Sequence, residues 1–311
     1  MPIIKKIIGI TIGDIAGIGP EVAIKALRSN NISPLFTPIL IGPREIWNSY
    51  GAAKLNFTIV DVPFKKRGRY VFGAPSRIGG EIAYDSLSTG IKLAQENMID
   101  ALVTAPLSKK SLYLAGFGFN GYTEILARKC KVKNFSMLMT SYKIFSLIIT
   151  RHKPFKDVSK GLKIKDIVAQ TAQCAQFIKD KVLKRKVRIA VSSLNPHSGE
   201  DGLLGNEEEK IIKPAVVQLR KKGLSAEGPI ASDHTFPLAL SGKFDLIVNH
   251  YHDQSMIPLK LISKGKIVNI TVGLPFLRTS PGHGVAFNIA GQDACDPTGM
   301  IAAINFAANY S

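Results

Sequence analysis

A strand, a tight turn and the start of a helix are all encoded in Ile7-Ile-Gly-Ile-Thr-Ile-Gly-Asp-Ile-Ala-Gly-Ile-Gly-Pro-Glu21. The residues up to Thr11 form an apolar run of strand length, and the glycines that follow permit a tight turn. Pro20 suits the first position of the helix that is expected from Glu21 to Arg28. The turn is not a dinucleotide fingerprint, because Val22 stands where a third glycine is required, and no Gly-Lys-Ser/Thr makes it a P-loop. It fits either a ligand-contacting loop or a plain tight turn.

Short apolar runs alternate with longer segments of helical period along the rest of the chain. This alternation favours an α/β architecture with a mainly parallel sheet. Strands are expected at residues 7–11, 38–41, 58–62, 101–104, 145–149, 188–192, 245–249 and 267–271. Helices are expected at residues 21–28, 81–97, 108–115, 164–179, 207–222 and 298–309. No internal repeat or low-complexity linker marks a domain boundary.

The composition indicates a folded protein that is not exported. The chain has 311 residues, which favours about two domains, and its 45% apolar and 21% charged residues argue against disorder. No apolar stretch reaches the roughly 18 residues of a membrane span, and the first apolar run is too short for a secretory signal. Cys130, Cys174 and Cys295 are odd in number and lack the spacing of a zinc or redox pair. We therefore expect a soluble, cytoplasmic protein with no membrane partner.

The net charge of +18 raises the question of a nucleic-acid partner. The basic residues form short, scattered clusters, without a basic tail or an aromatic-interleaved segment that would stack bases. A solvated surface is therefore the favoured interpretation, and no nucleic-acid partner is expected. A general positive field would also steer small anions toward the protein. The clusters lie at residues 65–67, 109–110, 184–186 and 220–222.

Three of the six histidines recur in one structural context. His152, His197 and His252 each lie just beyond a predicted strand, at the carboxyl edge where parallel sheets bind ligands. Three neutral imidazoles form a known catalytic metal site that leaves one position open for substrate or water. The alternative is that each histidine caps a loop independently, and the sequence leaves the choice between His250 and His252 open. A shared divalent-metal site is the favoured interpretation.

Polar residues crowd around these histidines in a pattern that packing does not require. Asn195 to Gly202 is a turn-rich acidic segment, and Asp253 and Gln254 directly follow a buried strand. Arg grips phosphate or carboxylate with a planar fork, whereas Lys supplies a point charge or a tunable base. With a metal ion, these groups would form an anion-binding acid–base site, in which Arg278 is expected to reach out from a loop. The further polar residues are Lys260, Asn269 and Arg278.

Several motifs form a recognisable set when they are taken together. They are Gly13 to Glu21, Val103-Thr-Ala-Pro-Leu-Ser-Lys109, Gly121-Tyr-Thr-Glu124, Leu194-Asn-Pro-His-Ser-Gly-Glu200, Gly202-Leu-Leu-Gly-Asn-Glu-Glu208, Tyr251-His-Asp-Gln254, Gly273-Leu-Pro-Phe-Leu-Arg-Thr-Ser280, His283-Gly284 and Asp296-Pro297. They span nearly the whole chain, and their joint signal is specific although several are weak alone. With them the chain resembles the 4-hydroxythreonine-4-phosphate dehydrogenase family of pyridoxal phosphate biosynthesis and its phospho-sugar-acid dehydrogenase paralogues.

The resemblance implies an α/β, two-lobed fold of the isocitrate/isopropylmalate-dehydrogenase type, with a cleft between the lobes and no Rossmann fingerprint. It implies a discontinuous first lobe at residues 1–125 and 260–311 and a second lobe at 126–259. The implied cofactors are NAD, or NADP, and a divalent metal such as Zn, Mg or Co. The implied partners are a small phosphorylated hydroxy acid and a second copy of the chain, in a homodimer with shared active sites.

The family's site residues carry over position by position. The metal ligands are His152, His197 and His252, and the substrate-binding positions are Tyr122, Thr123, Lys260, Asn269 and Arg278. Lys260 is also the expected catalytic residue, as acceptor of the hydroxyl proton. Tyr122 departs from the family pattern, which has histidine there. Tyrosine still donates a hydrogen bond, but it is larger and uncharged near neutral pH. The identity of the substrate is therefore the open part of this interpretation.

The implied reaction is the NAD-dependent, metal-assisted oxidation and decarboxylation of 4-phosphohydroxy-L-threonine to 3-amino-2-oxopropyl phosphate and CO2. Hydride transfer to the cofactor yields a β-keto acid, and the metal ion acts as a Lewis acid in both steps. A paralogous dehydrogenase of 4-phospho-threonate or 4-phospho-erythronate is the first alternative. A phosphotransacetylase-like acyltransferase would share the fold, but it would need neither NAD nor three metal-ligand histidines.

Overall fold

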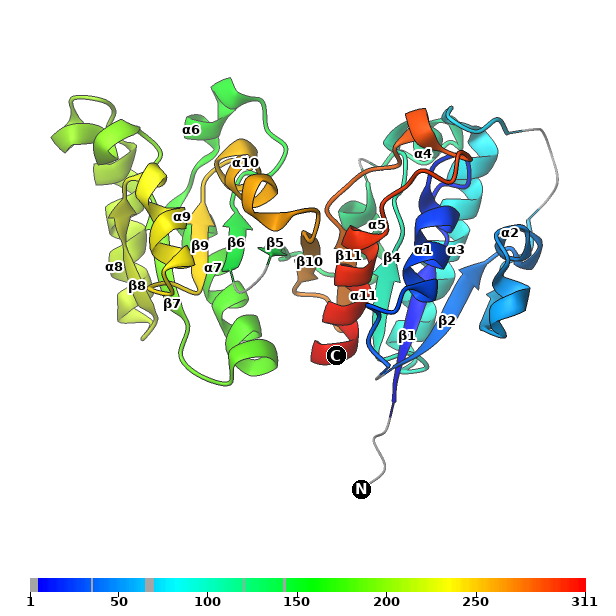
Figure 1. The fold of residues 1–311 in the computed structure, drawn as a ribbon. Helices are drawn as coiled ribbons and strands as arrows, with labels where there is room; N and C mark the ends of the chain where they lie inside the picture. The colour runs from blue at the N-terminus through cyan, green and yellow to red at the C-terminus, as the bar shows by residue number, and fades with distance from the viewer. Residues whose placement is uncertain (1–4, 35, 65–69, 120, 142–143) are drawn as a thin grey trace. The chain divides into compact units, whose positions relative to one another are not determined.

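The protein consists of two compact units in the computed structural model, which describes residues 5–34, 36–64, 70–119, 121–141 and 144–311 (Figure 1). The first unit comprises residues 1–133 and 274–311, and the second comprises residues 134–273. The lobes inferred from the sequence change at 125/126 and 259/260 instead. Lys260 and Asn269 therefore belong to the second unit, because the helix and the strand that carry them pack on strands of that unit.

The strands of the first unit are all parallel, in the order β3-β2-β1-β4-β11. Successive side chains of β1 point to opposite faces of the sheet. Thr11 approaches Gly90 of α3, and Ile8 and Ile10 therefore point to the face away from α3. Figure 1 shows α1 and α11 together on one face of these strands and α3 on the other. The strands are β1 Lys6–Thr11, β2 Phe36–Gly42, β3 Thr58–Asp61, β4 Ala101–Thr104 and β11 Leu277–Pro281. The helices are α1 Gly19–Arg28, α2 Arg44–Ser49, α3 Arg77–Gln95, α4 Lys109–Leu114, α5 Tyr122–Lys129 and α11 Thr298–Tyr310.

The strands of the second unit follow the order β10-β5-β6-β9-β7-β8, and only β5 runs antiparallel to its neighbours. The carboxyl ends of β6, β9 and β7 therefore meet at one edge, where the three predicted metal ligands follow. The strands are β5 Ser136–Ser141, β6 Ile144–Ile148, β7 Arg188–Ser192, β8 Ser225–Ile230, β9 Leu246–Asn249 and β10 Val268–Val272. The helices are α6 Val158–Gly161, α7 Ile164–Phe177, α8 Lys213–Lys221, α9 Ser232–Leu240 and α10 His252–Ser263.

Every strand expected from the sequence is present with ends within two residues, but several elements were missed. Helix α10 was missed because Pro258 lies in its interior, where proline normally ends a helix. Strand β11 was missed because Leu277 is its only apolar residue before the final proline, although all five positions are buried. The missed elements are β5, β8, β11, α2, α5, α6, α9 and α10.

Each unit has its own apolar core. In the first unit, Ile91 of α3 and Leu126 of α5 pack with Leu102 of β4. In the second unit, Leu259 of α10 packs with Ile148 of β6 and other buried residues. Separate cores are expected of units that are each compact alone.

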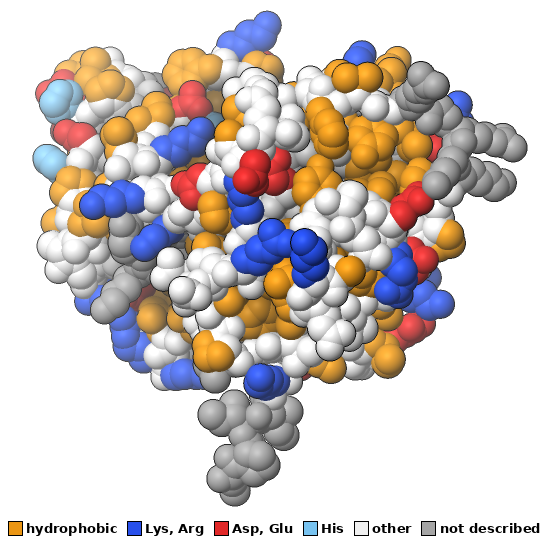
Figure 2. Space-filling model, turned by 45° about the vertical axis from the view of Figure 1, so that its right-hand side comes forward, with side chains coloured by type: hydrophobic (Ala, Val, Ile, Leu, Met, Phe, Trp, Pro, Cys, Tyr) orange, Lys and Arg blue, Asp and Glu red, His pale blue; other side chains and the backbone are white. Residues whose placement is uncertain are grey.

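Positive charge is dispersed on the face of the molecule in Figure 2. On the face that Figure 2 shows, Lys and Arg side chains are scattered among acidic, apolar and other polar side chains. Among the helices of the described residues, none combines the length and the apolar character that a membrane crossing requires.

Candidate active site

Arg278 is a buried cation of the first unit. It lies in β11, beside Leu102 of β4, and its side chain is 1% exposed. Its Nη2 donates to Oγ1 of Thr104, at the end of β4. The expectation that Arg278 reaches out from a loop is therefore wrong, because strand pairing and a buried hydroxyl hold its guanidinium inside the unit.

The ring of Tyr122 covers this guanidinium. Cζ of Arg278 lies 5.0 Å from the ring centroid, which is a cation–π contact. Tyr122 Oη donates to the carbonyl oxygen of Ala105. Burial raises the pKa of the Tyr122 hydroxyl and lowers the pKa of Arg278 to about 10, so the phenol is neutral and the guanidinium charged at neutral pH. The Tyr122 hydroxyl is thus bonded to the backbone, and the ring of Tyr122 contacts Arg278. Thr123 is the next residue in the first turn of α5, and its side chain is half-buried.

The glycine-rich segment 13–21 is a buried tight turn. Its backbone N–H groups bond within the protein: Asp14 donates to Pro106 O over 2.9 Å, and Gly17 donates to Asp14 O over 3.1 Å. A Cβ on Gly13, whose φ is +73°, would lie 2.3 Å from Pro106 O, so only glycine permits this close approach. Of the two interpretations that the sequence left open, these contacts support the plain tight turn. They identify no cradle for a dinucleotide in this segment.

Asp14 anchors the turn, and sequence reasoning did not single it out. Its carboxylate accepts hydrogen bonds from Ser111 Oγ over 2.5 Å and from the backbone N–H of Ala16 over 3.0 Å. The side chain is 0% exposed, and burial raises the pKa of its carboxyl group. The available signal was a single acidic residue within an apolar, glycine-rich turn, because a carboxylate there must find internal donors.

His152 and His252 of the second unit lie side by side. Their ring centroids are 5.5 Å apart and the rings are tilted by 41°. Nδ1 of His252 lies 2.6 Å from Oδ1 of Asp253, a contact that fixes the ring and leaves Nε2 pointing away. Metal-binding histidines are commonly oriented by a carboxylate in this way. The two imidazoles are accessible, and their chemistry fits a divalent cation of the kind that prefers nitrogen ligands.

The structure separates the roles of His250 and His252, which the sequence could not. His250 is 0% exposed, and its Nε2 lies 2.6 Å from the carbonyl oxygen of Ser192. Burial lowers the pKa of His250 to about 4, so its imidazole is neutral. Gln254 accepts a hydrogen bond from the His250 backbone and donates to Ser193 O. His250 is thereby held inside the unit, whereas the side chain of His252 is 41% exposed.

His197 occupies a left-handed turn. Residues 197–201 all have positive φ, and φ of His197 is 51°, a conformation that costs free energy in residues other than glycine. Glu208 holds the start of this turn, because Oε1 accepts from the backbone N–H groups of Leu194 (2.7 Å) and Asn195 (2.8 Å). The Glu208 carboxylate is buried, and the sequence did not identify it as part of the site.

One chain does not gather the three predicted ligands. Within the described ranges, no group of three His, Cys, Asp or Glu side chains is arranged to hold one cation. His152 and His252 come together, whereas His197, exposed on its turn, does not join them.

Lys260 and Asn269 differ in how they are held. Lys260 is exposed near the end of α10, and at 1.5 Å per residue it lies about 12 Å along the axis from His252. Asn269 is half-buried in β10, and its Oδ1 is a buried acceptor without a hydrogen-bond partner in the described part of the chain. Because buried acceptors are normally satisfied, this oxygen is open to a hydrogen bond from a water molecule or a ligand.

Comparisons with known proteins agree on one family. A family model described as pyridoxal phosphate biosynthetic protein PdxA matches residues 23–307. The chain is 36% identical to a 4-hydroxythreonine-4-phosphate dehydrogenase of Desulforapulum autotrophicum, over 98% of this chain and 95% of the relative. It is 37% identical to a provisionally named D-threonate 4-phosphate dehydrogenase of Oceanobacillus iheyensis, over 97% of each.

A solved structure agrees with the fold. The 4-hydroxythreonine-4-phosphate dehydrogenase of Klebsiella pneumoniae superposes with a TM-score of 0.88 at 31% identity, and the match covers 99% of both chains. The family, the α/β isocitrate-dehydrogenase-like fold class and the oxidoreductase class expected from the sequence are confirmed. The chain belongs to the pyridoxal phosphate biosynthetic protein PdxA family, whose named relatives are dehydrogenases of phosphorylated hydroxy acids.

Proposed function

We propose that this protein oxidises and decarboxylates 4-phosphohydroxy-L-threonine, with NAD or NADP as hydride acceptor and with a divalent metal ion. The observation that carries the proposal is the near-complete match to 4-hydroxythreonine-4-phosphate dehydrogenases at 36% identity. The buried Arg278, the paired His152 and His252, and the unsatisfied Oδ1 of Asn269 support it, because they supply the anion-binding and metal-binding groups that the reaction requires. A cytoplasmic location is part of the proposal, in keeping with the three free cysteines.

Arg278 is proposed to bind an anionic group of the substrate. Its charge persists at neutral pH although burial lowers its pKa to about 10, and the Tyr122 ring fixes the guanidinium plane. A cation held in one orientation binds phosphate or carboxylate without first being ordered. Thr123, one residue further along α5, would donate its hydroxyl to the same group.

His152 and His252 of one subunit and His197 of a second subunit are proposed to complete one metal site in a homodimer. The short distance between the first two rings and the separate position of His197 support this division. Glu208 would hold the turn that presents His197, and Asp253 would orient His252. When bound there, a divalent ion supplies Lewis-acid stabilisation of negative charge on the substrate oxygen.

Lys260 is proposed to accept the proton of the substrate hydroxyl. As the C–H bond breaks, its electron pair leaves as hydride to the nicotinamide ring and the hydroxyl carbon becomes a ketone. The resulting β-keto acid loses CO2, and a proton must return to the carbon that carried the carboxylate. Asn269 would hydrogen-bond the substrate through its unsatisfied Oδ1, which suits a hydroxyl or ammonium donor.

A second candidate substrate is 4-phospho-threonate, with 4-phospho-erythronate as its close analogue. Tyr122, which replaces the family's usual histidine beside Arg278, leaves the choice of phosphorylated acid open. The 37% identity to the provisionally named D-threonate 4-phosphate dehydrogenase supports this second candidate. A phosphotransacetylase-like activity has no comparable support, because the dehydrogenases above match nearly the whole chain at 31 to 37% identity.

The deciding experiment follows the absorbance of the reduced nicotinamide with each of the three phosphorylated acids, with NAD and NADP, before and after metal removal. We expect reduction with one acid to exceed the others by at least tenfold in kcat/KM, stoichiometric CO2 release, and loss of activity on chelation. Tyr122→His should shift the preference among the acids. Absence of nicotinamide reduction with all three acids in metal-loaded dimer would reject the proposal.

A further inference from the structure

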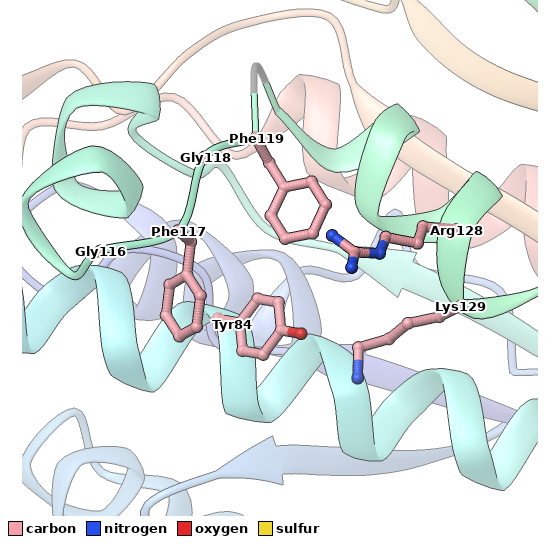
Figure 3. A pocket seen from close by; sticks show the side chains of 7 residues that line it. All are labelled: Tyr84, Gly116, Phe117, Gly118, Phe119, Arg128 and Lys129. Carbon is pink, nitrogen blue, oxygen red and sulfur yellow. The ribbon is translucent and has the colours of Figure 1, made fainter.

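A hollow of about 380 Å³ opens on the first unit, apart from the residues proposed for the dehydrogenase reaction (Figure 3). Its volume lies within the range of small-molecule sites. Neither the predicted metal ligands nor the predicted substrate residues line it. The lining residues are Tyr84 of α3, the segment from Gly116 to Phe119, and Arg128 and Lys129 at the end of α5.

Aromatic rings form the wall of the hollow. Tyr84 and Phe117 stack with centroids 3.9 Å apart and planes 18° from parallel. Phe119 lies 6.1 Å from Tyr84 and is also nearly parallel to it, at 16°. A Cβ on Gly116 or Gly118 would meet nothing within 4 Å, so the loop backbone leaves space beside these rings. Parallel rings next to open space suit another planar ring, which would gain offset-stacking contacts.

Two cations lie over the same rings in cation–π contacts. Lys129 Nζ lies 5.0 Å from the centroid of Tyr84, and Arg128 Cζ lies 5.5 Å from that of Phe119. Figure 3 shows the Tyr84 hydroxyl pointing toward both cations. Neither cation has a salt bridge within 4 Å in the described ranges, and Asp85, which is exposed, lies in electrostatic range of Lys129. Both cations are therefore available for charge-assisted contacts with an anion.

We propose that this hollow is a binding site for a planar aromatic ring that carries a phosphate group. The ring would stack beside Phe119 and Tyr84, and the phosphate would accept charge-assisted hydrogen bonds from Arg128 and Lys129. Adenine nucleotides and phosphorylated pyridines share this chemistry. This proposal is independent of the proposed reaction, and it does not depend on which phosphorylated acid the enzyme oxidises.

Isothermal titration calorimetry on the full-length protein tests this site. The probes are AMP and pyridoxine 5′-phosphate, which has no aldehyde to react with lysines, with adenosine, pyridoxine and inorganic phosphate as comparison compounds. We expect saturable binding of at least one phosphorylated ring, and at least tenfold weaker binding of its dephosphorylated form and of phosphate alone. AMP binding that NAD does not displace would assign the site to a nucleotide, whereas binding of only pyridoxine 5′-phosphate would assign it to a pyridine.

Variants separate the rings from the charges. Arg128→Gln and Lys129→Gln should each weaken binding about three- to tenfold, a range that allows for their partial exposure to solvent. Phe119→Leu should weaken ring binding without changing the response to phosphate, and a thermal melt checks that it folds. The matched control is Lys92→Gln, which alters an exposed lysine of α3, the helix that also carries Tyr84. It should have no effect on binding.

Three results would overturn the proposal. They are the absence of saturable binding by both phosphorylated rings, equal binding of inorganic phosphate, or an equal loss in the Lys92→Gln control. Dehydrogenase activity measured on the same samples distinguishes this failure from failure of the proposed function, because the two sites share no residue.

Discussion

The two units hold the side chains proposed for the active site in opposite ways. In the first unit, Arg278 is 1% exposed, its guanidinium covered by the ring of Tyr122 and bonded to Thr104. In the second unit, His252 keeps 41% of its side chain exposed, and His152 is exposed as well. The buried guanidinium is held in place by contacts within its own chain, whereas the two exposed imidazoles belong to no group of three metal-binding side chains within the described residues.

This difference separates stability from function. A buried polar group contributes to folding and to binding at once, because its removal leaves a cavity and unsatisfied neighbours. An exposed ligand contributes little to folding, because water replaces whatever it loses. Substitution of the buried Arg278 should therefore lower both stability and activity, and substitutions at the two exposed histidines should lower activity alone.

The largest effect is expected from Arg278→Ala. Loss of a charge-assisted contact of roughly 1.5 to 3 kcal/mol should lower kcat/KM by about ten- to a hundredfold or more. The cavity beside Tyr122 should also lower the free energy of unfolding by about 2 to 4 kcal/mol. Steady-state kinetics and urea unfolding measure the two losses. Arg77→Ala, at a side chain that is 77% exposed, should change neither. An unchanged kcat/KM in folded Arg278→Ala would contradict the binding role.

The next largest effect is expected at the paired histidines. His152→Ala and His252→Ala should each remove most of the bound metal and activity, while the free energy of unfolding of metal-free protein changes by less than about 0.5 kcal/mol. Metal analysis and calorimetry check this, with His234→Ala, 71% exposed, as the control. Mixed dimers of His152→Ala with His197→Ala should regain activity, because one of the two sites then contains all three ligands. Full metal occupancy in the single variants would refute the assignment.

Asp245 is a buried residue of the second unit. The variant Asp245→Asn therefore tests whether burial, rather than the unit in which a residue lies, determines how much a substitution lowers stability. Burial alone would raise its pKa, but hydrogen bonds from Arg185 and Arg188 outweigh burial and hold the pKa well below its usual range. A depressed pKa contributes stability above the unfolded value of about 3.9, and this contribution is lost as the pH falls through the folded value. We expect the variant to lose about 2 to 3 kcal/mol at neutral pH.

The pH dependence provides the check on Asp245. Between about pH 5 and pH 3, the Tm of Asp245→Asn should fall less steeply than that of the unaltered protein, because the variant has no carboxylate to protonate there. Asp233→Asn, at a side chain that is 80% exposed, should follow the unaltered protein. Dehydrogenase activity at neutral pH should be unchanged in both variants. Parallel melting curves for Asp245→Asn and the unaltered protein would show that the buried carboxylate is not stabilising.

The smallest effect is expected from Glu208→Gln, which alters a buried side chain that supports an exposed histidine. Glu208 is buried, yet it acts on an exposed ligand, because it holds the turn that carries His197. The neutral amide keeps the shape but weakens these bonds, so metal affinity should fall about tenfold. Glu209→Gln, whose partner is the exposed Lys213, is the control. A loss of stability without any change in metal affinity would limit Glu208 to a structural role.

The elements that carry the site were harder to predict than the fold itself. Strands such as Ala101–Thr104 and Arg188–Ser192 are present with the predicted bounds, because a strand covered on both faces needs a continuous apolar run. Helix α10 and strand β11, which carry Lys260 and Arg278, were missed because Pro258 and a run of polar residues contradict local rules there. Local rules are commonly broken at functional sites, where the surrounding structure compensates.

The sequence by itself determined the alternation of strands and helices, the family, and the position of His152, His197 and His252 beyond strand ends, because these follow from local patterning and motif order. Only the tertiary structure decided that His250 is internal and His252 accessible, since both follow the same strand and differ only in what packs around them. It alone placed the ring of Tyr122 against Arg278 across about 150 intervening residues. Burial and pairing depend on which distant segments meet, and no local pattern in the sequence records that.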